Sequence, residues 1–453
     1  MPKKKTALTI EERLQQALVP AEEQPYEVPE NWVWVRLGDV NKYISKSVNP
    51  ISEPDKIFEL YSVPSMVDNY PEIIAGSDIG SSKQSVCKKD VLLCKINPRI
   101  NRVWKVSQFT DNELIASSEW IVIRNNHIDA NYLMYCFQSK YFREFMLSNV
   151  SGVGGSLMRA QPKYVQTYPI PLPPLSEQQR IVERIEELFA KLDEAKERLQ
   201  EAADSFAVRK AAILHKAFTG ELTKQWRREN GVSDASWENV SLDSVCKSIY
   251  DGDHMPPPKS ETGIPFLVIS NVNTGFISFE KCRFVPEEYY DSLSETRTPE
   301  IGDILYTIVG SYGIPVMVDT DKKFCFQRHM ALLKPKDIYN RFLWRQLQTQ
   351  SFFEQATSIA TGTAQLTVPI KGLRKLLVKC PTLPEQHEIV RLIDDLLARE
   401  RSAQQATEQA LASIDLMKKS ILARAFRGEL GTNKASEASA LELLRQVLAE
   451  NRS

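Results

Sequence analysis

Several motifs that carry enzyme chemistry are absent from this 453-residue sequence. It contains no G-x-x-x-x-G-K-[ST] phosphate loop and no G-x-G-x-x-G loop opening a helix, the two glycine-rich patterns that cradle nucleotides. It also contains no Asn-Pro-Pro-Tyr/Phe tetrapeptide, typical of amino-methyltransferases, and no G-x-S-x-G nucleophile elbow. We therefore expect no nucleotide, methyl-transfer or serine-hydrolase chemistry on this chain. A site assembled from distant residues would escape this search.

Metal-binding and disulfide patterns are missing as well. The seven cysteines include no C-x-x-C pair, and the five histidines include no H-E-x-x-H motif. An odd number of scattered cysteines is typical of reduced thiols in a protein core. The sequence predicts neither a metal site nor a disulfide framework.

Long apolar runs and a strong net charge are absent too. No run of eighteen apolar residues offers a membrane span, and residues 6–20 are too polar for the apolar region of a signal peptide, so we expect a cytoplasmic protein. The net charge of −1 does not decide whether the partner is nucleic acid. A chain of this length exceeds one hydrophobic core, which predicts several domains.

What the chain does have is an internal repeat. Residues 175–222 align with residues 383–430 at a constant offset of 208 without a gap, and 19 of the 48 positions are identical. Both copies end on the phrase Ala-Phe-x-Gly-Glu-Leu. Identity at this level in one register indicates two copies of one structural unit.

Each copy has the pattern of a long helix. Apolar residues recur at alternating spacings of four and three, the heptad pattern of a coiled coil, although Glu400 and Thr407 weaken the second copy. We expect Ser176 to cap the first helix and Gly220 and Gly428 to end the two helices in the left-handed conformation. Because a lone amphipathic helix of this length is marginal in water, the two copies should pack on each other, and we favour an antiparallel pair with pseudo-twofold symmetry.

The predicted architecture alternates globular domains with these helices. Between the helical copies, short strands broken by Gly, Pro and Asn indicate two α/β or α+β domains. The termini each carry a short amphipathic segment, and these could pair or be independent. The predicted parts are an N-terminal arm (1–26), a first domain (27–174), a first long helix (175–222), a second domain (233–382), a second long helix (383–430) and a C-terminal helical tail (431–453).

Two stretches depart from the neutral background. Residues 83–105 and residues 322–345 each carry seven Lys or Arg against one acid. Cations interleaved with Asn, Gln and Ser suit phosphate positioning and base-edge contacts, so the two stretches predict a nucleic-acid interface in each domain. The alternative interpretation is an ordinary solvated surface.

The layout and its motifs resemble the specificity subunit of type I restriction-modification enzymes. The resemblance rests on residues 26–38, on Pro-Leu-Ser-Glu-Gln at 174–178 with its Leu-Pro-Glu-Gln copy at 383–386, and on the two Ala-Phe-x-Gly-Glu-Leu endings. In the second domain, Asp251-Gly-Asp-His254, Gly-Asp-Ile-Leu at 302–305 and Gly-Ser-Tyr-Gly at 310–313 add to it.

This resemblance implies a non-catalytic reader of double-stranded DNA. Two target-recognition domains would read the halves of a bipartite site, and the antiparallel helices would set the spacing. Two modification subunits, which carry S-adenosylmethionine and methylate adenine, and motor-nuclease subunits that use ATP and Mg would be the partners, leaving no cofactor on this chain. The first domain lacks Asp-Gly-x-His and has residues 96–102 where the second has residues 308–313, which implies an asymmetric target.

Loop residues with donors and acceptors are the candidate DNA contacts. For Asp251-Gly-Asp-His254, a purely structural turn is an equally good interpretation. Two other functions stay open for the whole chain: a coiled-coil adaptor that binds protein alone, and a stand-alone nuclease with a site hidden from motif search. The candidates are Lys83, Gln84, Lys95, Asn97, Arg99, Asn101 and Arg102 in the first domain, and Asp251, His254, Lys259, Asn271, Ser311, Tyr312 and Arg328 in the second.

Overall fold

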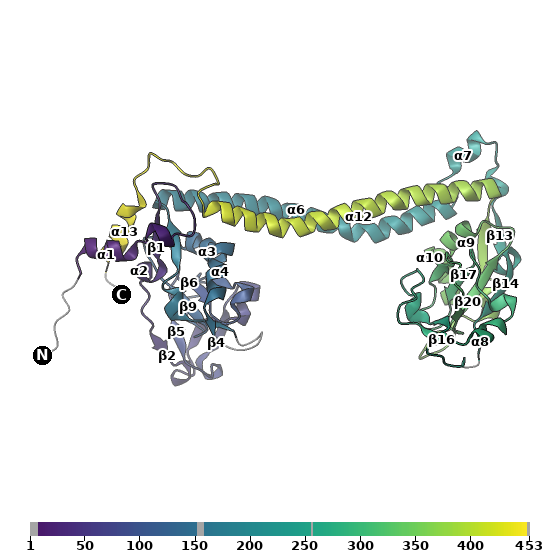
Figure 1. Ribbon diagram of the computed structural model, residues 1–453, viewed down its shortest axis with the longest axis horizontal. Helices are drawn as coiled ribbons and strands as arrows, with labels where there is room; N and C mark the ends of the chain where they lie inside the picture. Colours follow the sequence, from purple (N-terminus) through teal and green to yellow (C-terminus); the bar gives the residue numbers. More distant parts are fainter. Residues whose placement is uncertain (1–7, 152–157, 255–256, 451–453) are drawn as a thin grey trace. The chain divides into compact units, whose positions relative to one another are not determined.

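The computed structural model describes residues 8–151, 158–254 and 257–450 and divides into two compact units (Figure 1). Unit 1 contains residues up to Arg198 together with those from Ala410 onward. Unit 2 is the continuous segment Leu199–Gln409. Each unit holds one globular domain and parts of both long helices.

The globular part of unit 1 is built on two sheets. One is antiparallel with strand order β7-β6-β9, and the other has order β2-β5-β8-β3-β4, in which β3 and β8 are parallel. Two shorter pairs, β1-β12 and β10-β11, complete the strands. The strands are β1 (Val33–Arg36), β2 (Ser47–Val48), β3 (Ile57–Tyr61), β4 (Glu72–Ala75), β5 (Lys83–Ser85), β6 (Val91–Cys94), β7 (Val103–Lys105), β8 (Glu113–Ala116), β9 (Trp120–Ile123), β10 (Val150–Ser151), β11 (Arg159–Ala160) and β12 (Pro169–Leu172). The helices are α1 (Ile10–Ala17), α2 (Leu37–Val40), α3 (Ala130–Gln138), α4 (Lys140–Ser148), α5 (Pro162–Val165) and α13 (Ala440–Ala449).

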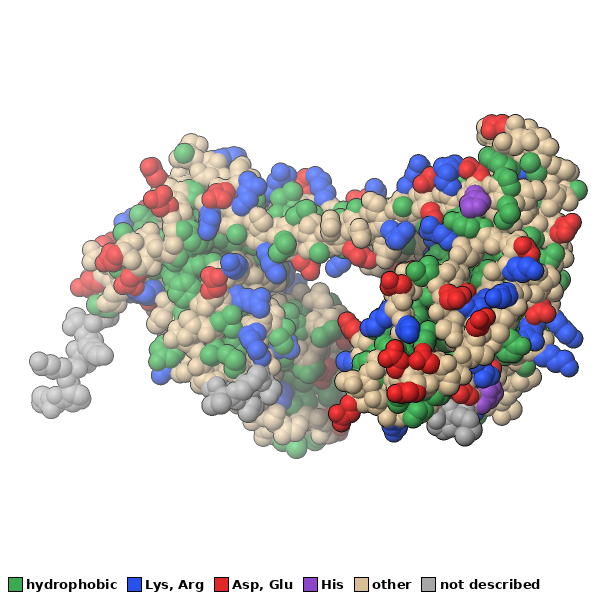
Figure 2. All heavy atoms as spheres, turned by 45° about the vertical axis from the view of Figure 1, so that its right-hand side comes forward, with side chains coloured by type: hydrophobic (Ala, Val, Ile, Leu, Met, Phe, Trp, Pro, Cys, Tyr) green, Lys and Arg blue, Asp and Glu red, His purple; other side chains and the backbone are tan. Residues whose placement is uncertain are grey.

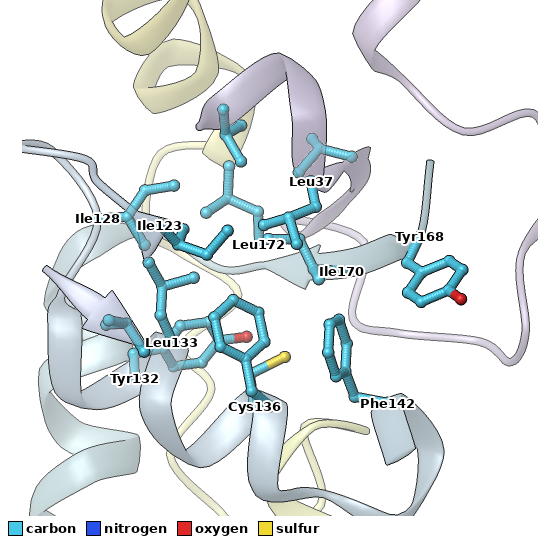
Figure 3. Close-up of a cluster of buried hydrophobic side chains, with 14 of the residues drawn as sticks. Leu37, Ile123, Ile128, Tyr132, Leu133, Cys136, Phe142, Tyr168, Ile170 and Leu172 are labelled. Carbon is cyan, nitrogen blue, oxygen red and sulfur yellow. The ribbon is translucent and has the colours of Figure 1, made fainter. Parts of the chain in front are cut away.

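The core of unit 1 joins these elements to the long helices. Side chains of α3, α4 and β12, among them Leu133, Phe142 and Ile170, point toward one another (Figure 3). The same core includes Ile181 and Phe426, which belong to the beginning and the end of the two repeated segments. Such burial of apolar side chains, at about 25 cal/mol per Å² removed from water, is what attaches the domain to the helices.

The two terminal helices pack together in unit 1. α1 and α13 are in contact, and Leu14 of α1 and Leu444 of α13 are buried in the same core. Of the two interpretations left open by the sequence, pairing of the terminal segments is therefore the one observed.

Unit 2 repeats the central sheet of unit 1. Its four-stranded antiparallel sheet has the order β14-β20-β17-β18, in which β17, β20 and β18 correspond to β6, β9 and β7. A three-stranded sheet, β16-β15-β19, and the pair β13-β21 complete it. The strands are β13 (Glu238–Ser241), β14 (Cys246–Asp251), β15 (Ile264–Leu267), β16 (Arg283–Val285), β17 (Ile304–Thr307), β18 (Pro315–Met317), β19 (Cys325–Phe326), β20 (Met330–Pro335) and β21 (Leu377–Cys380). The helices are α7 (Lys224–Glu229), α8 (Glu287–Asp291), α9 (Asn340–Leu347), α10 (Gln350–Ser358) and α11 (Ile370–Leu373). The predicted mixed α and β domains in two copies are confirmed.

The repeated segments form two long helices that pack antiparallel, as predicted. They are α6 (Leu175–Phe218) and α12 (Leu383–Ala425). In unit 1, Lys418 Nζ lies 2.5 Å from Asp193 Oδ1, and in unit 2, Arg209 Nε lies 2.8 Å from Glu400 Oε2. The numbering rises along one helix while it falls along the other. The second pair also explains why a glutamate stands in the seam of α12.

The ends of the helices follow the prediction only in part. Gly220 and Gly428 have φ of 80° and 74°, the left-handed conformation expected of them. Ser176, in contrast, is not the N-cap, because α6 already begins at Leu175 and the Pro174 carbonyl accepts from the amide of Gln178. A helix start preceded by two prolines is set by their fixed φ rather than by a side-chain cap.

A buried glutamate at the start of each long helix accepts a hydrogen bond from a threonine that lies one or two residues beyond the end of the other repeat. Thr223 Oγ1 donates to Glu385 Oε1 over 2.7 Å, and Thr432 Oγ1 donates to Glu177 Oε1 over 3.3 Å. We call these contacts the helix-end lock. Its glutamates are fully buried and accept further bonds, from Arg227 in unit 2 and from Trp32 in unit 1.

Candidate nucleic-acid interface

Two hairpins of different sequence occupy the same place in the two units. Residues 95–102 connect β6 to β7, and residues 308–314 connect β17 to β18, the equivalent strands. Left-handed φ values occur in both, at Asn97 and Asn101 in unit 1 and at Gly310 and Gly313 in unit 2. Asparagine tolerates this conformation and glycine adopts it freely, so both hairpins turn through left-handed residues while they carry different side chains.

The unit 1 hairpin presents cations on a well-held backbone. The Asn97 amide donates to the Met158 carbonyl over 2.8 Å, and Asn101 Nδ2 donates to the Gln138 carbonyl over 3.1 Å. Arg99 is exposed at the tip, and the Arg143 guanidinium donates to its carbonyl. Five of the seven predicted residues of the first domain therefore lie on this one hairpin: Lys95, Asn97, Arg99, Asn101 and Arg102.

The remaining two predicted residues of the first domain lie on β5 and make internal hydrogen bonds. Gln84 Nε2 donates to the carbonyls of Ser117 and Trp120, so its amide holds the protein together and has little to offer DNA. Lys83 Nζ donates to the Ser81 carbonyl over 2.9 Å, and partial burial lowers its pKa.

In unit 2, three predicted residues meet in one groove. Asp251, His254 and Arg328 line a cavity of about 390 Å³. The groove also contains three polar residues that were not predicted from the sequence, His329, Gln365 and Thr367. No sequence pattern marks Gln365, whereas His329 could have been inferred from its place beside Arg328. The remaining residues that line the groove are Ile308, Val309, Val368, Pro369 and Ile370.

Gly252 explains the Asp-Gly-x-His motif. A Cβ at this position would lie 2.4 Å from the carbonyl oxygen of Phe326 and 2.8 Å from the amide nitrogen of Arg328, too close for any side chain. The glycine thus lets the end of β14 approach the loop that carries Arg328, and Asp253 forms a parallel bridge with Gln327. The motif has a structural role and shapes the groove at the same time.

The polar groups of the groove are both donors and acceptors. His254 Nε2 lies 2.8 Å from Asp251 Oδ2, and Arg297 Nε donates to the Asp251 carbonyl over 3.0 Å. Arg328 is exposed and forms no ion pair with any residue that the structure describes. Burial and the neighbouring Arg328 charge lower the pKa of His329. Mixed donors and acceptors suit base edges better than phosphate alone.

Other predicted residues of the second domain lie elsewhere. Asn271 is only 5% exposed, and its amide bonds the Val268 amide and the Glu280 carbonyl, so we remove it from the candidates. Ser311 is exposed on the β17–β18 hairpin, where Tyr312 stacks on Phe353 with ring centroids 5.5 Å apart. Lys259 is exposed outside the groove lining. DNA contact by the remaining candidates stays a prediction.

The basic stretch at residues 322–345 is not one surface patch, contrary to the prediction. Lys334 is buried and bonds the carboxylates of Asp303 and Glu300, while Arg345 bonds Asp394. A buried cation needs a paired anion, and these pairs are invisible in a local charge count. Basic and acidic side chains are interspersed on the face shown in Figure 2.

Membrane-spanning helices and grouped metal ligands are both absent from the part of the chain that the structure describes. No helix in this described part is long and apolar enough to cross a membrane, and no three His, Cys, Asp or Glu side chains in it are grouped so that they could hold a metal ion.

Comparison with known proteins identifies the domain family. Residues 29–203 and 235–411 both match the model of the type I restriction modification DNA specificity domain. The EcoBI specificity subunit of Escherichia coli is 29% identical over 304 residues, which cover 62% of this chain and 64% of that protein. The EcoKI specificity subunit of Escherichia coli K12 is 27% identical over 342 residues, 71% of this chain and 72% of that protein. The MjaVIII specificity subunit of Methanocaldococcus jannaschii is 26% identical over 408 residues, 85% of this chain and 92% of that protein.

The fold is shared with a solved structure. The HsdS subunit from Thermoanaerobacter tengcongensis superimposes with a TM-score of 0.67 at 23% identity, covering 90% of this chain and 99% of that chain. Two matches to one domain model, in the register of the internal repeat, span more than half of the sequence. The chain therefore belongs to the family of type I restriction-modification specificity subunits.

Proposed function

We propose that this chain reads an asymmetric, two-part DNA site, with one half-site contacted by each globular domain. The observation that carries the proposal is the pair of equivalent hairpins bearing different side chains, Arg99 and its neighbours in unit 1 and the loop beside the Arg328 groove in unit 2. The two hairpins hold equivalent positions but carry different donors and acceptors. They should therefore contact different bases, which favours two half-sites of different sequence.

The antiparallel helices support a role in fixing the distance between the half-sites. A helix of 43 or 44 residues has a length of about 65 Å at 1.5 Å per residue, long enough to separate two contacts on one duplex. The helix-end lock joins the segment after each long helix to the start of the other helix. A spacer of this kind would make the separation of the half-sites a property of the protein.

Catalysis is proposed to belong to partner subunits. Two modification subunits that bind S-adenosylmethionine and methylate adenine, and motor-nuclease subunits that use ATP and Mg, would assemble on this chain in the cytoplasm. The chain itself would supply neither a catalytic group nor a cofactor site. Support comes from the naming of its relatives as specificity subunits and from a similar solved chain, with a TM-score of 0.67, reported in work on complex assembly of a type I R-M system.

The test is to express the chain with its modification subunits in cells that lack other adenine methylation and to map methylated adenines across the genome. We expect one two-part motif with different halves and one spacer length. No motif, despite an assembled complex, would favour a protein-binding adaptor instead. Metal-dependent cleavage of DNA by the purified chain alone would favour a nuclease and contradict the proposal.

A further inference from the structure

A glutamine at the start of each long helix joins three elements at one point. Gln178 Oε1 accepts from the Asp129 amide over 2.8 Å, and Gln178 Nε2 donates to the Pro173 carbonyl over 2.9 Å. Asp129 is the N-cap of α3, and Pro173 connects β12 to α6. One side chain thus links the globular domain, the connecting segment and the long helix. We call this arrangement the glutamine bracket.

The bracket is repeated in unit 2 with the same geometry. Gln386 Oε1 accepts from the Tyr339 amide over 2.8 Å, and Gln386 Nε2 donates to the Pro381 carbonyl over 2.8 Å. Tyr339 is the N-cap of α9, the counterpart of α3. The globular domains differ in their hairpins and grooves, yet this junction is the same in both.

Burial makes the bracket specific. Gln178 is 0% exposed and Gln386 is 1% exposed, so water does not compete for either amide. A buried donor or acceptor left without a partner is costly, and a planar amide satisfies both of its ends only in a narrow range of orientations. The bracket therefore holds the first turn of α3 or α9 at a fixed position relative to the long helix.

We propose that Gln178 and Gln386 are positioning residues that set the angle between each DNA-reading domain and its long helix, and thereby the spacer length of the two-part site. This inference rests on the proposed function. A rotation of about 10° at a radius of about 20 Å, the scale of such a domain, shifts its far surface by about 3.5 Å, which matches the rise of one base pair. Loss of the bracket should therefore change spacing by single base pairs.

The test uses substitutions that keep the side-chain volume. Gln178→Met and Gln386→Met remove both hydrogen bonds and fill the same space, while Gln179→Met is the matched control because Gln179 is the exposed neighbour on the same helix turn. Each variant is assembled with the modification subunits, and methylated sites are mapped across a library of duplexes whose spacers differ in length. Thermal unfolding of every variant shows whether it is folded.

We expect Gln178→Met and Gln386→Met to keep both half-site sequences and to accept at least one further spacer length, one base pair longer or shorter. Gln179→Met should retain the single wild-type spacer. A merely structural role would lower the melting temperature and the yield of methylation without changing the spacer distribution. That result in folded bracket variants would overturn the inference.

Two further outcomes are separated by the design. If either Met variant fails to fold, the corresponding leucine variant, Gln178→Leu or Gln386→Leu, replaces it, since leucine also removes both hydrogen bonds without burying a charge. A spacer distribution identical to wild type in that folded variant would then reject the inference. If the wild-type complex itself selects no two-part site, the proposed function fails and the inference falls with it.

Discussion

The hydroxyl of Thr223 donates a 2.7 Å hydrogen bond to the carboxylate of Glu385, although 162 residues separate them in the chain. Thr223 follows the end of the first repeat, and Glu385 stands at the start of the second long helix. Because Arg227 bonds the same carboxylate oxygen over 2.7 Å, removing this acceptor would leave the buried guanidinium with the exposed Asp234 as its remaining anionic partner among the described residues.

Glu385→Ala is therefore expected to lower the free energy of unfolding of unit 2 by about 3–5 kcal/mol, the usual result of breaking a buried ion pair on one side. Native-state hydrogen exchange of unit 2 amides measures this change, since a chain with two units need not unfold in one step. Glu408→Ala, on the exposed face of the same helix, should change stability by less than about 0.5 kcal/mol. Equal effects of the two substitutions would contradict the role of the lock.

A tryptophan lies near the lock in each unit, Trp32 at Glu177 and Trp237 with its ring centroid 5.9 Å from Cζ of Arg227, and their unequal hydrogen bonding predicts unequal effects of one substitution. Trp32 Nε1 donates to Glu177 Oε2 over 2.7 Å, whereas the indole nitrogen of Trp237 has no partner among the described residues. Trp32→Phe loses a hydrogen bond to a charged group, which costs about 1.5–3 kcal/mol beyond the change in packing. Trp237→Phe loses no hydrogen bond. It should therefore lower the free energy of unfolding by a clearly smaller amount, as measured by native-state hydrogen exchange. A larger effect for Trp237→Phe would refute this assignment.

Stability of unit 1 should depend on acid pH through Glu437. Arg180 bonds this carboxylate through two nitrogens, at 2.8 and 2.7 Å, and holds its pKa below the ordinary value. A depressed pKa in the folded state means that the stabilising contribution is fully present above the unfolded-state pKa of about 4.3 and is lost as pH falls through the folded-state pKa. The stability difference between wild type and Glu437→Gln, followed by urea unfolding of unit 1, should thus be largest near neutral pH and shrink below about pH 4. A difference that stays constant down to pH 3 would exclude this ion pair as its source.

Arg328→Ala should change which base is selected in one half-site. An arginine that contacts a base edge contributes about 1–3 kcal/mol of discrimination, whereas one that contacts phosphate affects all sequences alike and sets the salt dependence. Site selection with the assembled complex is expected to show relaxed choice at one position of the second half-site, with the first half-site unchanged. Arg99→Ala should act on the first half-site instead. Lys322→Ala, exposed outside the groove, is the control; an equal loss of selectivity with Lys322→Ala would remove Arg328 from the candidates.

Shortening both long helices should shorten the spacer. Residues 201–207 and 403–409 belong to facing parts of α6 and α12 in unit 2, as the Arg209–Glu400 pair indicates. Deleting these seven residues from each helix keeps the heptad register and removes about 10 Å, or about three base pairs of duplex. Mapping of methylated sites should reveal the same half-sites with a shorter spacer. An unchanged spacer would exclude the helices as the measuring element.

Local patterns in the sequence predicted the features that depend on local physics. Heptad periodicity and the ungapped repeat predicted α6 and α12 and their packing on each other, whereas the antiparallel direction was favoured because it gives a pseudo-twofold arrangement of the two domains. Glycine identity predicted the left-handed residues Gly220 and Gly428. These features follow from neighbours a few residues away, which is where sequence patterns are informative.

Long-range pairing was beyond the sequence. Nothing local marks Glu177 as the acceptor for Thr432, nor Lys334 as the buried partner of Asp303. A charged side chain in a basic stretch is exposed or buried according to what the fold places opposite it, and that depends on tertiary structure. Asp251 and His254 were candidates because they belong to one short motif with Gly252, whereas Gln365 lies in a distant segment and nothing in the sequence connects it with them.

The pairing of α1 with α13 has a consequence for synthesis of the chain. Unit 2 is one continuous segment, so all of its residues have been made once the ribosome passes Gln409. Unit 1 needs residues from both sides of that segment, including Thr432 and Leu444. At about 5–20 residues per second, synthesis of the roughly 250 residues between Arg198 and Ala449 keeps the domain that is translated first waiting about 12–50 seconds for its last helix. The domain that is made first is thus completed last. Until α13 is synthesised, the part of its core that α13 covers stays exposed, and chaperones should bind there.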